Sequence, residues 1–258
     1  MMIQLIQSSQ NKQFKDWKKL LQTRGRKKQQ RYLVEGIHLV QEALKTNQSL
    51  DGILVTEDFL KHNEVDLKEI QQSIYQLPSS LFNELAQTKT PQGIIAVVND
   101  RPLKQPEQWT GRLLLIDAVQ DPGNLGTMIR TAHGAGYDGV ILGKGTVDYL
   151  NDKVIRSTQG SVWHIPIYEA DLDTVISDLK KQKHPVYATA LNQQAVSYAQ
   201  VDYPSSFGII VGNEGQGVNP QFINQATQSI YIPMPGQAES LNVAVATGIL
   251  LFHNVIKD

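Results

Sequence analysis

Residues 121–136, 209–218 and 232–252 read DPGNLGTMIRTAHGAG, IIVGNEGQGV and IPMPGQAESLNVAVATGILLF, and these three segments decide the fold. Each places glycines and small polar residues just after an apolar, strand-like run and before or within a helix-like one. Open α/β sheets gather their ligand-binding loops at such places. The pattern therefore predicts an α/β enzyme whose site is built from three separate loops.

The apolar runs around these segments alternate with helix-like stretches from residue 113 onward. Continuous apolar strands separated by helices indicate a parallel sheet covered on both faces. The predicted strands are 113–117, 139–142, 164–168, 186–190, 207–211 and 229–232. Periodicity by itself predicts an ordinary doubly wound sheet, because connections that thread through one another are nearly absent among proteins.

A domain boundary is expected near residues 99–112, NDRPLKQPEQWTGR, where two prolines, a glycine and scattered charges separate apolar runs. We expect one domain over residues 1–105 and a second over residues 106–258. In the first, residues 34–45 and 79–87 are typical of helices, and residues 53–56 and 93–99 are typical of strands. The first domain is therefore a small α/β module.

The amino-acid composition excludes some classes of function but does not identify one. The chain has 258 residues, a formal net charge of −1 and no cysteine, so disulfides, thiolate nucleophiles and cysteine-ligated metal sites are excluded. No apolar stretch reaches membrane-spanning length, and the N-terminus lacks the long apolar region of a signal peptide. We expect a cytoplasmic protein with no membrane partner.

Basic charge is concentrated in residues 11–31, which carry nine Lys or Arg side chains against one acid, whereas acidic residues dominate elsewhere. With Trp17 and Tyr32 nearby, this segment suits contacts to RNA phosphates and bases. The alternative, a solvated amphipathic helix followed by a basic turn, stays open. The candidate RNA-binding residues are Lys18, Lys19, Arg24, Arg26, Lys27, Lys28 and Arg31.

The glycines of the second segment are spaced GxxGxG, which is neither the dinucleotide fingerprint nor a phosphate loop. A GTPase or a dehydrogenase is therefore disfavoured. Gly212, Gly215 and Gly217 let the backbone approach a ligand, and Asn213 and Glu214 can hydrogen-bond it. A plain strand-to-helix turn is the alternative explanation.

Polar side chains mark the starts of two predicted helices. In the first segment Asn124 can cap the helix and Arg130 can form a surface ion pair, or both can meet a ligand at the same loops. In the third segment Ser240 is a candidate N-cap, and Asn242 in an otherwise apolar turn needs a hydrogen-bond partner. The following helix is apolar on nearly all sides and is expected to be buried within the domain or against a second subunit.

In order and residue by residue, the three segments resemble the motifs of the SpoU/TrmH family of RNA ribose 2′-O-methyltransferases. The resemblance covers about residues 113–258, and Ala244 stands where the family usually has a second serine. Many members of this family carry a substrate-binding domain that is similar in fold to ribosomal protein L30e. Residues 24–44 resemble that domain. The resemblance implies a SPOUT fold with a deep trefoil knot, a homodimer formed through the C-terminal domain, and S-adenosyl-L-methionine as cofactor.

The resemblance also implies roles for particular residues. Arg130 would position the ribose 2′-hydroxyl and stabilise the developing alkoxide, since a guanidinium is a poor base. The implied catalytic residues are Asn124, Arg130, Glu214, Ser240 and Asn242. The implied cofactor-binding residues are Thr189, Ala190, Leu191, Gly212, Asn213, Gly217, Ile232, Met234, Ser240 and Leu241.

No metal is expected, because the histidines lack the spacing of a metal site, and His133 is interpreted as a favourable charge at a helix C-terminus. The expected activity is methylation of RNA, with ribosomal RNA as the favoured substrate. Two alternatives remain: ribose methylation of transfer RNA, and a non-catalytic RNA-binding protein. Retention of Asn124, Arg130, Glu214 and Asn242 together argues against the second.

Overall fold

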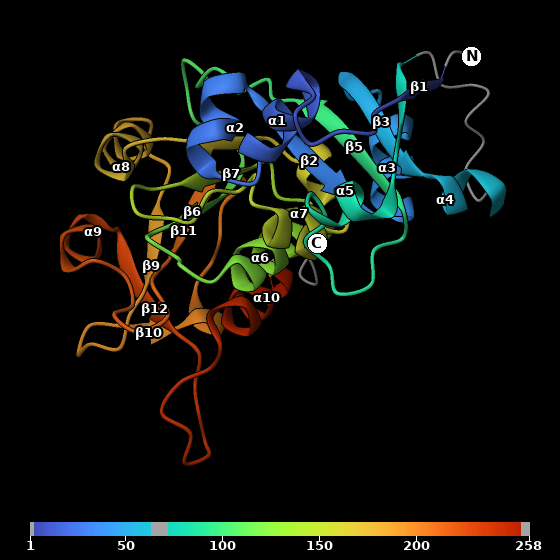
Figure 1. Cartoon of the computed structure of the whole chain (residues 1–258). Helices are drawn as coiled ribbons and strands as arrows, with labels where there is room; N and C mark the ends of the chain where they lie inside the picture. The colour runs from blue at the N-terminus through green and yellow to red at the C-terminus, as the bar shows by residue number, and fades with distance from the viewer. Residues whose placement is uncertain (1–2, 63–71, 254–258) are drawn as a thin grey trace. The chain divides into compact units, whose positions relative to one another are not determined.

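The computed structural model describes residues 3–62 and 72–253, which fold into two compact units (Figure 1). The first unit comprises the chain up to Arg101 together with Asp148–Trp163, and the second comprises Pro102–Val147 and the chain from His164. The predicted division at 105/106 did not anticipate that residues 148–163 belong to the first unit. No helix among the described residues is long and apolar enough to cross a membrane.

The first unit is built on a mixed five-stranded sheet in the order β1-β4-β3-β5-β2. Strand β5 runs antiparallel to both β2 and β3, and the remaining pairs are parallel. The strands are β1 (Ile3–Leu5), β2 (Arg31–Glu35), β3 (Leu50–Thr56), β4 (Ile74–Leu77) and β5 (Ile94–Asn99). The helices are α1 (Lys12–Lys19), α2 (Thr23–Gln29), α3 (Ile37–Lys45), α4 (Glu57–His62) and α5 (Ser79–Asn83).

Alternation along the strands gives this sheet two apolar faces. Val34 and Val55 pack with Val40 of α3 in one cluster, whereas Leu33 and Leu54 belong to another cluster with α1 and α5. Residues 34 and 35, expected at the start of a helix, instead complete β2. The helix begins after Gly36, whose φ of 104° lies in the region that favours glycine.

The segment 148–163 contains α7 (Asp152–Thr158) and a 3₁₀ turn, and it packs on the first sheet. Leu150 and Ile155 join the apolar cluster of Val34. The indole Nε1 of Trp163 donates to the Tyr32 hydroxyl over 2.9 Å. These buried contacts explain why the segment belongs to the first unit although its sequence neighbours do not.

The second unit is a seven-stranded sheet in the order β10-β12-β9-β11-β6-β7-β8, and all of its strand pairs are parallel. Helices α8 and α9 cover one face and α6 and α10 the other (Figure 1). The strands are β6 (Arg112–Ile116), β7 (Gly139–Leu142), β8 (Ile167–Glu169), β9 (Val186–Thr189), β10 (Val196–Ser197), β11 (Phe207–Val211) and β12 (Gln228–Tyr231). The helices are α6 (Pro122–Gly134), α8 (Leu172–Lys181), α9 (Pro220–Gln225) and α10 (Val243–His253).

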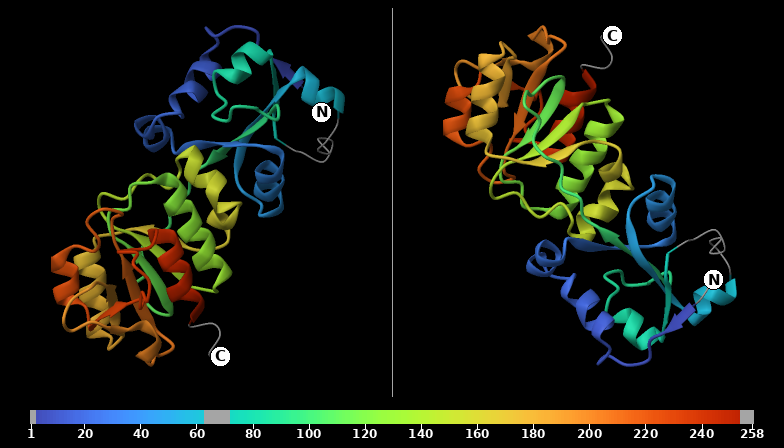
Figure 2. Two further views of the ribbon diagram at one scale, coloured as in Figure 1. Left: turned by 90° about the horizontal axis from the view of Figure 1, so that it is seen from below. Right: turned by 90° about the horizontal axis from the view of Figure 1, so that it is seen from above.

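The parallel sheet confirms the predicted architecture of the second unit, and the six predicted strands correspond to β6, β7, β8, β9, β11 and β12. The two-residue strand β10 was not predicted, because two residues carry no readable alternation. Figure 2 shows the ribbon from two further sides, with α6 and α10 lying side by side. The trefoil knot is not tested by the strand order and stays a prediction.

Candidate active site

The loop after β11 closes on itself through its backbone. Asn213 N donates to Gly217 O over 3.0 Å, and Gly217 N donates to Asn213 O over 2.9 Å. Gly217 has a φ of 70°, and a Cβ on Gly212 would lie 2.1 Å from backbone atoms of Gly217 and Val218. The requirement for glycine at position 212 therefore comes from the loop's own backbone.

Asn213 fixes this loop internally and ties it to the segment after β6. Its Oδ1 accepts from the N–H groups of Gly215 and Gln216 at 2.9 and 3.1 Å. Its Nδ2 donates to the carbonyl oxygen of Ala118 over 2.9 Å. Ala118 has a φ of 55°, a left-handed conformation that is uncommon for alanine and is held here by the surrounding loops.

The α6 helix is capped by Asp121, whose Oδ1 accepts from Asn124 N over 2.9 Å. The alternative role of Asn124 as the N-cap is therefore wrong. Proline at the first helical position strengthens the start, because it lacks an N–H that would be unpaired there. The Asn124 side chain therefore does not cap the helix and can form hydrogen bonds with the other loops.

Glu214 accepts hydrogen bonds from the first segment through both carboxylate oxygens. Its Oε1 accepts from Asp121 N and from Asn124 Nδ2, each over 3.0 Å, and its Oε2 accepts from Gln120 N over 3.1 Å. Burial raises the pKa of Glu214, but the hydrogen bonds from Asn124, Asp121 and Gln120 outweigh it and lower the pKa overall. Glu214 is therefore an ionised acceptor at neutral pH.

Asn242 brings the third segment into the same network. Its Nδ2 donates to Asn124 Oδ1 over 3.0 Å, and its Oδ1 accepts from Ala244 N over 2.9 Å at the start of α10. The predicted partner of Asn242 is thus present, but the expected N-cap, Ser240, is not the cap. Asn242, Asn124 and Glu214 form one hydrogen-bonded chain that joins the three motifs.

A cavity of about 620 Å³ lies between the loops after β9, β11 and β12 and the start of α10. This volume is within the range of sites for small molecules and cofactors. All ten residues assigned to cofactor binding line it: Thr189, Ala190, Leu191, Gly212, Asn213, Gly217, Ile232, Met234, Ser240 and Leu241. Of the assigned catalytic residues, Glu214, Ser240 and Asn242 line it, whereas Asn124 and Arg130 do not.

Sequence reasoning missed several lining residues, including Val211, Tyr231, Glu239 and Ala246. They carry no motif of their own, and their nearness to motif residues along the chain is the only signal that could have found them. Their apolar and polar groups give the cavity mixed walls. Such walls suit a ligand that combines a flat ring with charged ends.

Arg130 lies on the exposed face of α6, nearly two turns after Asn124. Among residues 3–62 and 72–253 it has no hydrogen-bond or ion-pair partner, so its role as a surface ion pair is not observed. An exposed guanidinium with five N–H donors can bind a phosphate or a ribose oxygen. The structure therefore leaves Arg130 available to a substrate.

The basic segment 11–31 forms α1, α2 and the start of β2, and its charges are not equivalent. Arg26 is only 5% exposed and its Nη2 lies 2.6 Å from Asp148 Oδ2, so the prediction that it contacts RNA is wrong. Lys18 pairs with Glu84 over 2.5 Å and Lys19 with Asp16 over 2.7 Å, both at the surface. The remaining candidates are Arg24, Lys27, Lys28 and Arg31, of which Arg31 pairs with Asp51.

The histidines of the second unit do not gather with other possible metal ligands within residues 102–147 and 164–253. No cluster of three metal-ligating side chains occurs in the part of the chain that the structure describes. The rings of His133 and His164 stack at 5.0 Å, and burial together with the neighbouring His164 lowers the pKa of His133. The interpretation of His133 as a charge at the helix end is therefore wrong at neutral pH.

Comparison with known proteins agrees with both units. Residues 111–252 match the SpoU rRNA Methylase family, and residues 11–96 match the MRM3-like substrate binding domain. The chain is 45% identical over 249 residues to the 23S rRNA (guanosine(2553)-2′-O)-methyltransferase RlmP of Bacillus subtilis (strain 168), covering 96% of this chain and 98% of that protein.

Solved structures show the same fold over nearly the whole chain. The AdoMet-bound rRNA methyltransferase from Sinorhizobium meliloti has a TM-score of 0.84 at 29% identity and covers 97% of each chain. The crystal structure of an RNA 2′-O ribose methyltransferase has a TM-score of 0.82 at 28% identity and covers 98% of each. With motifs, fold and full-length relatives in agreement, this chain belongs to the SpoU rRNA Methylase family.

Proposed function

We propose that this protein is an S-adenosyl-L-methionine-dependent RNA ribose 2′-O-methyltransferase that acts on ribosomal RNA. The observation that carries the proposal is the hydrogen-bonded chain Asn242–Asn124–Glu214, which joins the three family motifs beside the cavity. A protein that only bound RNA would have no need of such a site. Work on ribosomal RNA implies a cytoplasmic location where ribosomes are assembled.

The cavity fits the cofactor by size and by chemistry. Val211, Ile230 and Ile232 offer apolar contacts for an adenine ring, and Glu239 and Ser240 offer polar groups for the ribose and the amino acid part. The AdoMet-bound neighbour from Sinorhizobium meliloti supports the same ligand here. S-adenosyl-L-methionine supplies a methyl group that is already activated on a sulfonium. The protein must therefore mainly align the ribose hydroxyl with this methyl group and exclude water.

Arg130 is proposed to hold the ribose 2′-hydroxyl of the substrate. Its guanidinium is a cation that carries only N–H donors, and so it stabilises a developing alkoxide rather than removing a proton. The proton passes to a substrate phosphate or to water. Asn124, fixed between Glu214 and Asn242, is proposed to orient the same nucleotide, with Ser240 at the cavity wall nearby.

RNA recruitment is proposed for the basic helices of the first unit. Arg24, Lys27, Lys28 and Arg31 present cations on α2 and β2, with Lys18 and Lys19 on α1. Lysine and arginine contacts to phosphates give affinity without sequence preference. The match of residues 11–96 to a substrate-binding domain supports this division of labour.

The substrate is further proposed to be 23S ribosomal RNA, at the guanosine that corresponds to the one named for the Bacillus subtilis relative. The support is 45% identity across both domains, including the substrate-binding one. Ribose methylation of transfer RNA is the competing outcome. Comparing methylation of 23S ribosomal RNA and of transfer RNA in the same assay distinguishes these two possible substrates.

A homodimer formed through α10 is also proposed, together with the family's trefoil knot. Val245 and Phe252 on α10 are 53% and 41% exposed, and Leu241 just before the helix is 38% exposed. A stripe of exposed apolar side chains on an otherwise apolar helix indicates a partner surface. A second copy of the chain is the partner that symmetric assembly favours.

Two measurements test the proposed function. Calorimetric titration should show that the purified protein binds S-adenosyl-L-methionine, and tritium from the labelled methyl group should enter ribosomal RNA taken from cells that lack the protein. Binding without transfer to any RNA would exclude the methyltransferase assignment, and transfer to a base rather than to ribose would exclude the proposed chemistry.

A further inference from the structure

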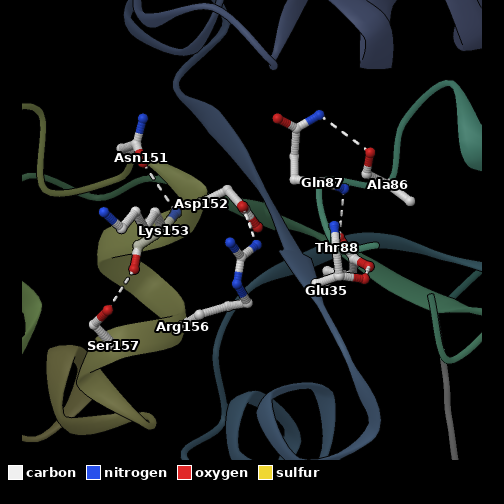
Figure 3. Close-up of polar contacts among 9 residues, drawn as sticks. All are labelled: Glu35, Ala86, Gln87, Thr88, Asn151, Asp152, Lys153, Arg156 and Ser157. Atoms are coloured by element: carbon white, nitrogen blue, oxygen red, sulfur yellow. Dashed lines mark hydrogen bonds and ion pairs between the residues drawn. The ribbon is translucent and has the colours of Figure 1, made fainter. Parts of the chain in front are cut away.

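The first unit buries a carboxylate that the proposed methyl transfer does not use. Glu35, at the end of β2, is only 5% exposed. Its Oε2 accepts from Gln87 N over 2.7 Å and from Thr88 N over 3.3 Å, and its Oε1 accepts from the Thr88 hydroxyl. Figure 3 shows this group beside the side chains of α7. Glu35 thus fixes the loop before β5 and presents a negative charge inside the unit.

Helix α7 adds a second carboxylate close to the first. Asp152 Oδ2 accepts from Arg156 Nη1 one helical turn later, as Figure 3 shows. Its other oxygen, Oδ1, has no partner among the described residues. Burial raises the pKa of Asp152, and the charge of Glu35 acts in the same direction, although Arg156 opposes both. The group is held in place yet incompletely hydrogen-bonded.

A cavity of about 170 Å³ lies between these carboxylates and the basic helices. It is several times larger than the ~30 Å³ that a water molecule occupies in the liquid. Its polar wall includes Glu35, Gln87, Asn151, Asp152, Arg156 and Arg26, and Arg26 already donates to Asp148, Leu20 and Thr23. Its apolar wall is made by the side chains of Leu20, Leu21, Leu33, Leu85, Ile95 and Leu150.

Part of the cavity's lining comes from the segment with the greatest excess of basic charge, through Leu20, Leu21 and Arg26. Leu20 and Leu21 join α1 to α2, so the cavity wall is continuous with the helices that carry Arg24 and Lys28. Lys153 of α7, which is exposed, lies on the cavity's other side. A polyanion attracted to these cations would be brought close to the residues that line the cavity.

We propose that this cavity takes one unpaired nucleobase of the RNA substrate, with the leucines against the faces of the base and the carboxylates on its edge. The inference rests on the proposed function, since it assumes an RNA substrate. Proteins that bind single-stranded or flipped nucleotides hold the base between apolar side chains and read its edge by hydrogen bonds. The cavity combines both kinds of wall.

Guanine is the base that the carboxylates of Glu35 and Asp152 favour. Its Watson–Crick edge carries N1–H and N2–H₂ donors, and carboxylate oxygens only accept when ionised. Asp152 Oδ1 has an unused acceptor site, and Glu35 keeps acceptor capacity beyond its bonds to Gln87 and Thr88. Uracil, with a single imide N3–H donor between two carbonyl oxygens, matches two carboxylates poorly.

Two variants of the full-length protein test the cavity. Asp152→Asn keeps an oxygen for Arg156 and replaces the other acceptor by a donor, and Leu21→Trp fills the space from its rim. Each should raise KM for a 23S rRNA fragment about tenfold, while kcat at saturating RNA and affinity for S-adenosyl-L-methionine stay at the wild-type level. Glu57→Gln, which removes an exposed carboxylate of α4 outside the cavity, is the matched control and should change none of these.

Unchanged KM in folded Asp152→Asn and Leu21→Trp proteins would overturn the proposal and leave the cavity as a hydrated packing gap. If either variant does not fold, photo-crosslinking of the wild type to RNA containing 6-thioguanosine decides. Crosslinked peptides should include residues 20–21 or 150–156, and crosslinks found only elsewhere would refute the site. Methylation with a normal KM by both variants refutes the cavity alone, whereas no methylation by the wild type refutes the proposed function.

Discussion

Asn242 donates from its Nδ2 to Oδ1 of Asn124 over 3.0 Å, although 118 positions separate the two residues in the sequence. The same Asn124 donates to Glu214 over 3.0 Å. Each amide is therefore oriented by a neighbour from a different motif. A network whose members are all hydrogen-bonded holds its geometry, and losing one member misplaces the others. The site depends on all three loops at once.

Replacing Asn124 with alanine should separate activity from stability. Because Asp121 caps α6, Asn124→Ala should change the melting temperature little, while removal of both hydrogen bonds should abolish most methyl transfer. Asp121→Ala is the matched control and should lower stability by about 1 kcal/mol. Thermal denaturation and a methyl-transfer assay on both variants check this, and a large loss of stability in Asn124→Ala would show that the capping assignment is wrong.

Substitution of Arg130 should act on the methyl-transfer step and not on cofactor binding. Arg130→Ala should lower kcat on the order of 100-fold, as expected for loss of one group that stabilises developing negative charge. Affinity for S-adenosyl-L-methionine should stay unchanged, because Arg130 does not line the cavity. Arg130→Lys keeps the charge but not the planar fork and should recover only part of the rate. Near-normal turnover in Arg130→Ala would remove this residue from the mechanism.

Two glycines in the same loop make a matched pair. A Cβ on Gly212 would lie 2.1 Å from the backbone of residues 217 and 218, whereas one on Gly215 would meet only Asn213 Oδ1, at 3.6 Å. Gly212→Ala should therefore displace the loop and abolish cofactor binding, and Gly215→Ala should bind nearly normally. Calorimetric titration compares them. Equal affinities would mean that the conformation of the loop does not control the cavity.

The proposed dimer is tested by two substitutions on α10 that differ in exposure. Val245 is 53% exposed and Leu251 is 0% exposed. Val245→Asp should give a folded monomer, because the charge would be buried only in the dimer, and Leu251→Asp should fail to fold, because it buries an unpaired carboxylate within the chain. Sedimentation velocity and circular dichroism distinguish these results. A wild type that sediments as a monomer while remaining active would end the dimer proposal.

RNA affinity should depend on salt through the cations of α2. Arg24→Gln with Lys28→Gln should weaken binding of ribosomal RNA fragments and lower the slope of log affinity against log salt by about 1 for each phosphate that is no longer neutralised. Glu57→Gln serves as a control outside this surface. Deletion of residues 1–105 is a poor substitute, since it would remove the packing partners of Leu150 and Ile155. An unchanged slope in the double variant would refute the surface.

The sequence predicted the parallel sheet and the three site loops because their signals are local. Apolar runs such as residues 207–211 read directly as buried strands, and glycine with asparagine marks the loops that follow them. The residues proposed to bind the cofactor could be chosen from the sequence because the family motifs retain their order, and in the structure they line one cavity. The hydrogen bonds that link Asn124 to Glu214 and Asn242 could not, since they depend on the fold.

Helix N-caps and the burial of individual side chains were less predictable from the sequence, because both depend on where the chain turns. Ser240 and Asn124 are good N-cap residue types, yet Asn242 and Asp121 occupy the cap positions. Arg26 belongs to a run of mostly exposed cations in the sequence. In the structure it is buried and pairs with Asp148, a residue more than a hundred positions away. The return of residues 148–163 to the first unit has the same cause, since only tertiary packing brings Trp163 to Tyr32.

The most direct test of the proposed activity is to locate the transferred methyl group. The purified protein is incubated with S-adenosyl-L-methionine and unmodified 23S ribosomal RNA, and the RNA is digested to nucleosides and mapped by mass spectrometry. We expect one 2′-O-methylguanosine at a single site with the wild type and none with Arg130→Ala. A methyl group on a base, on transfer RNA only, or on no RNA at all would contradict the proposed function.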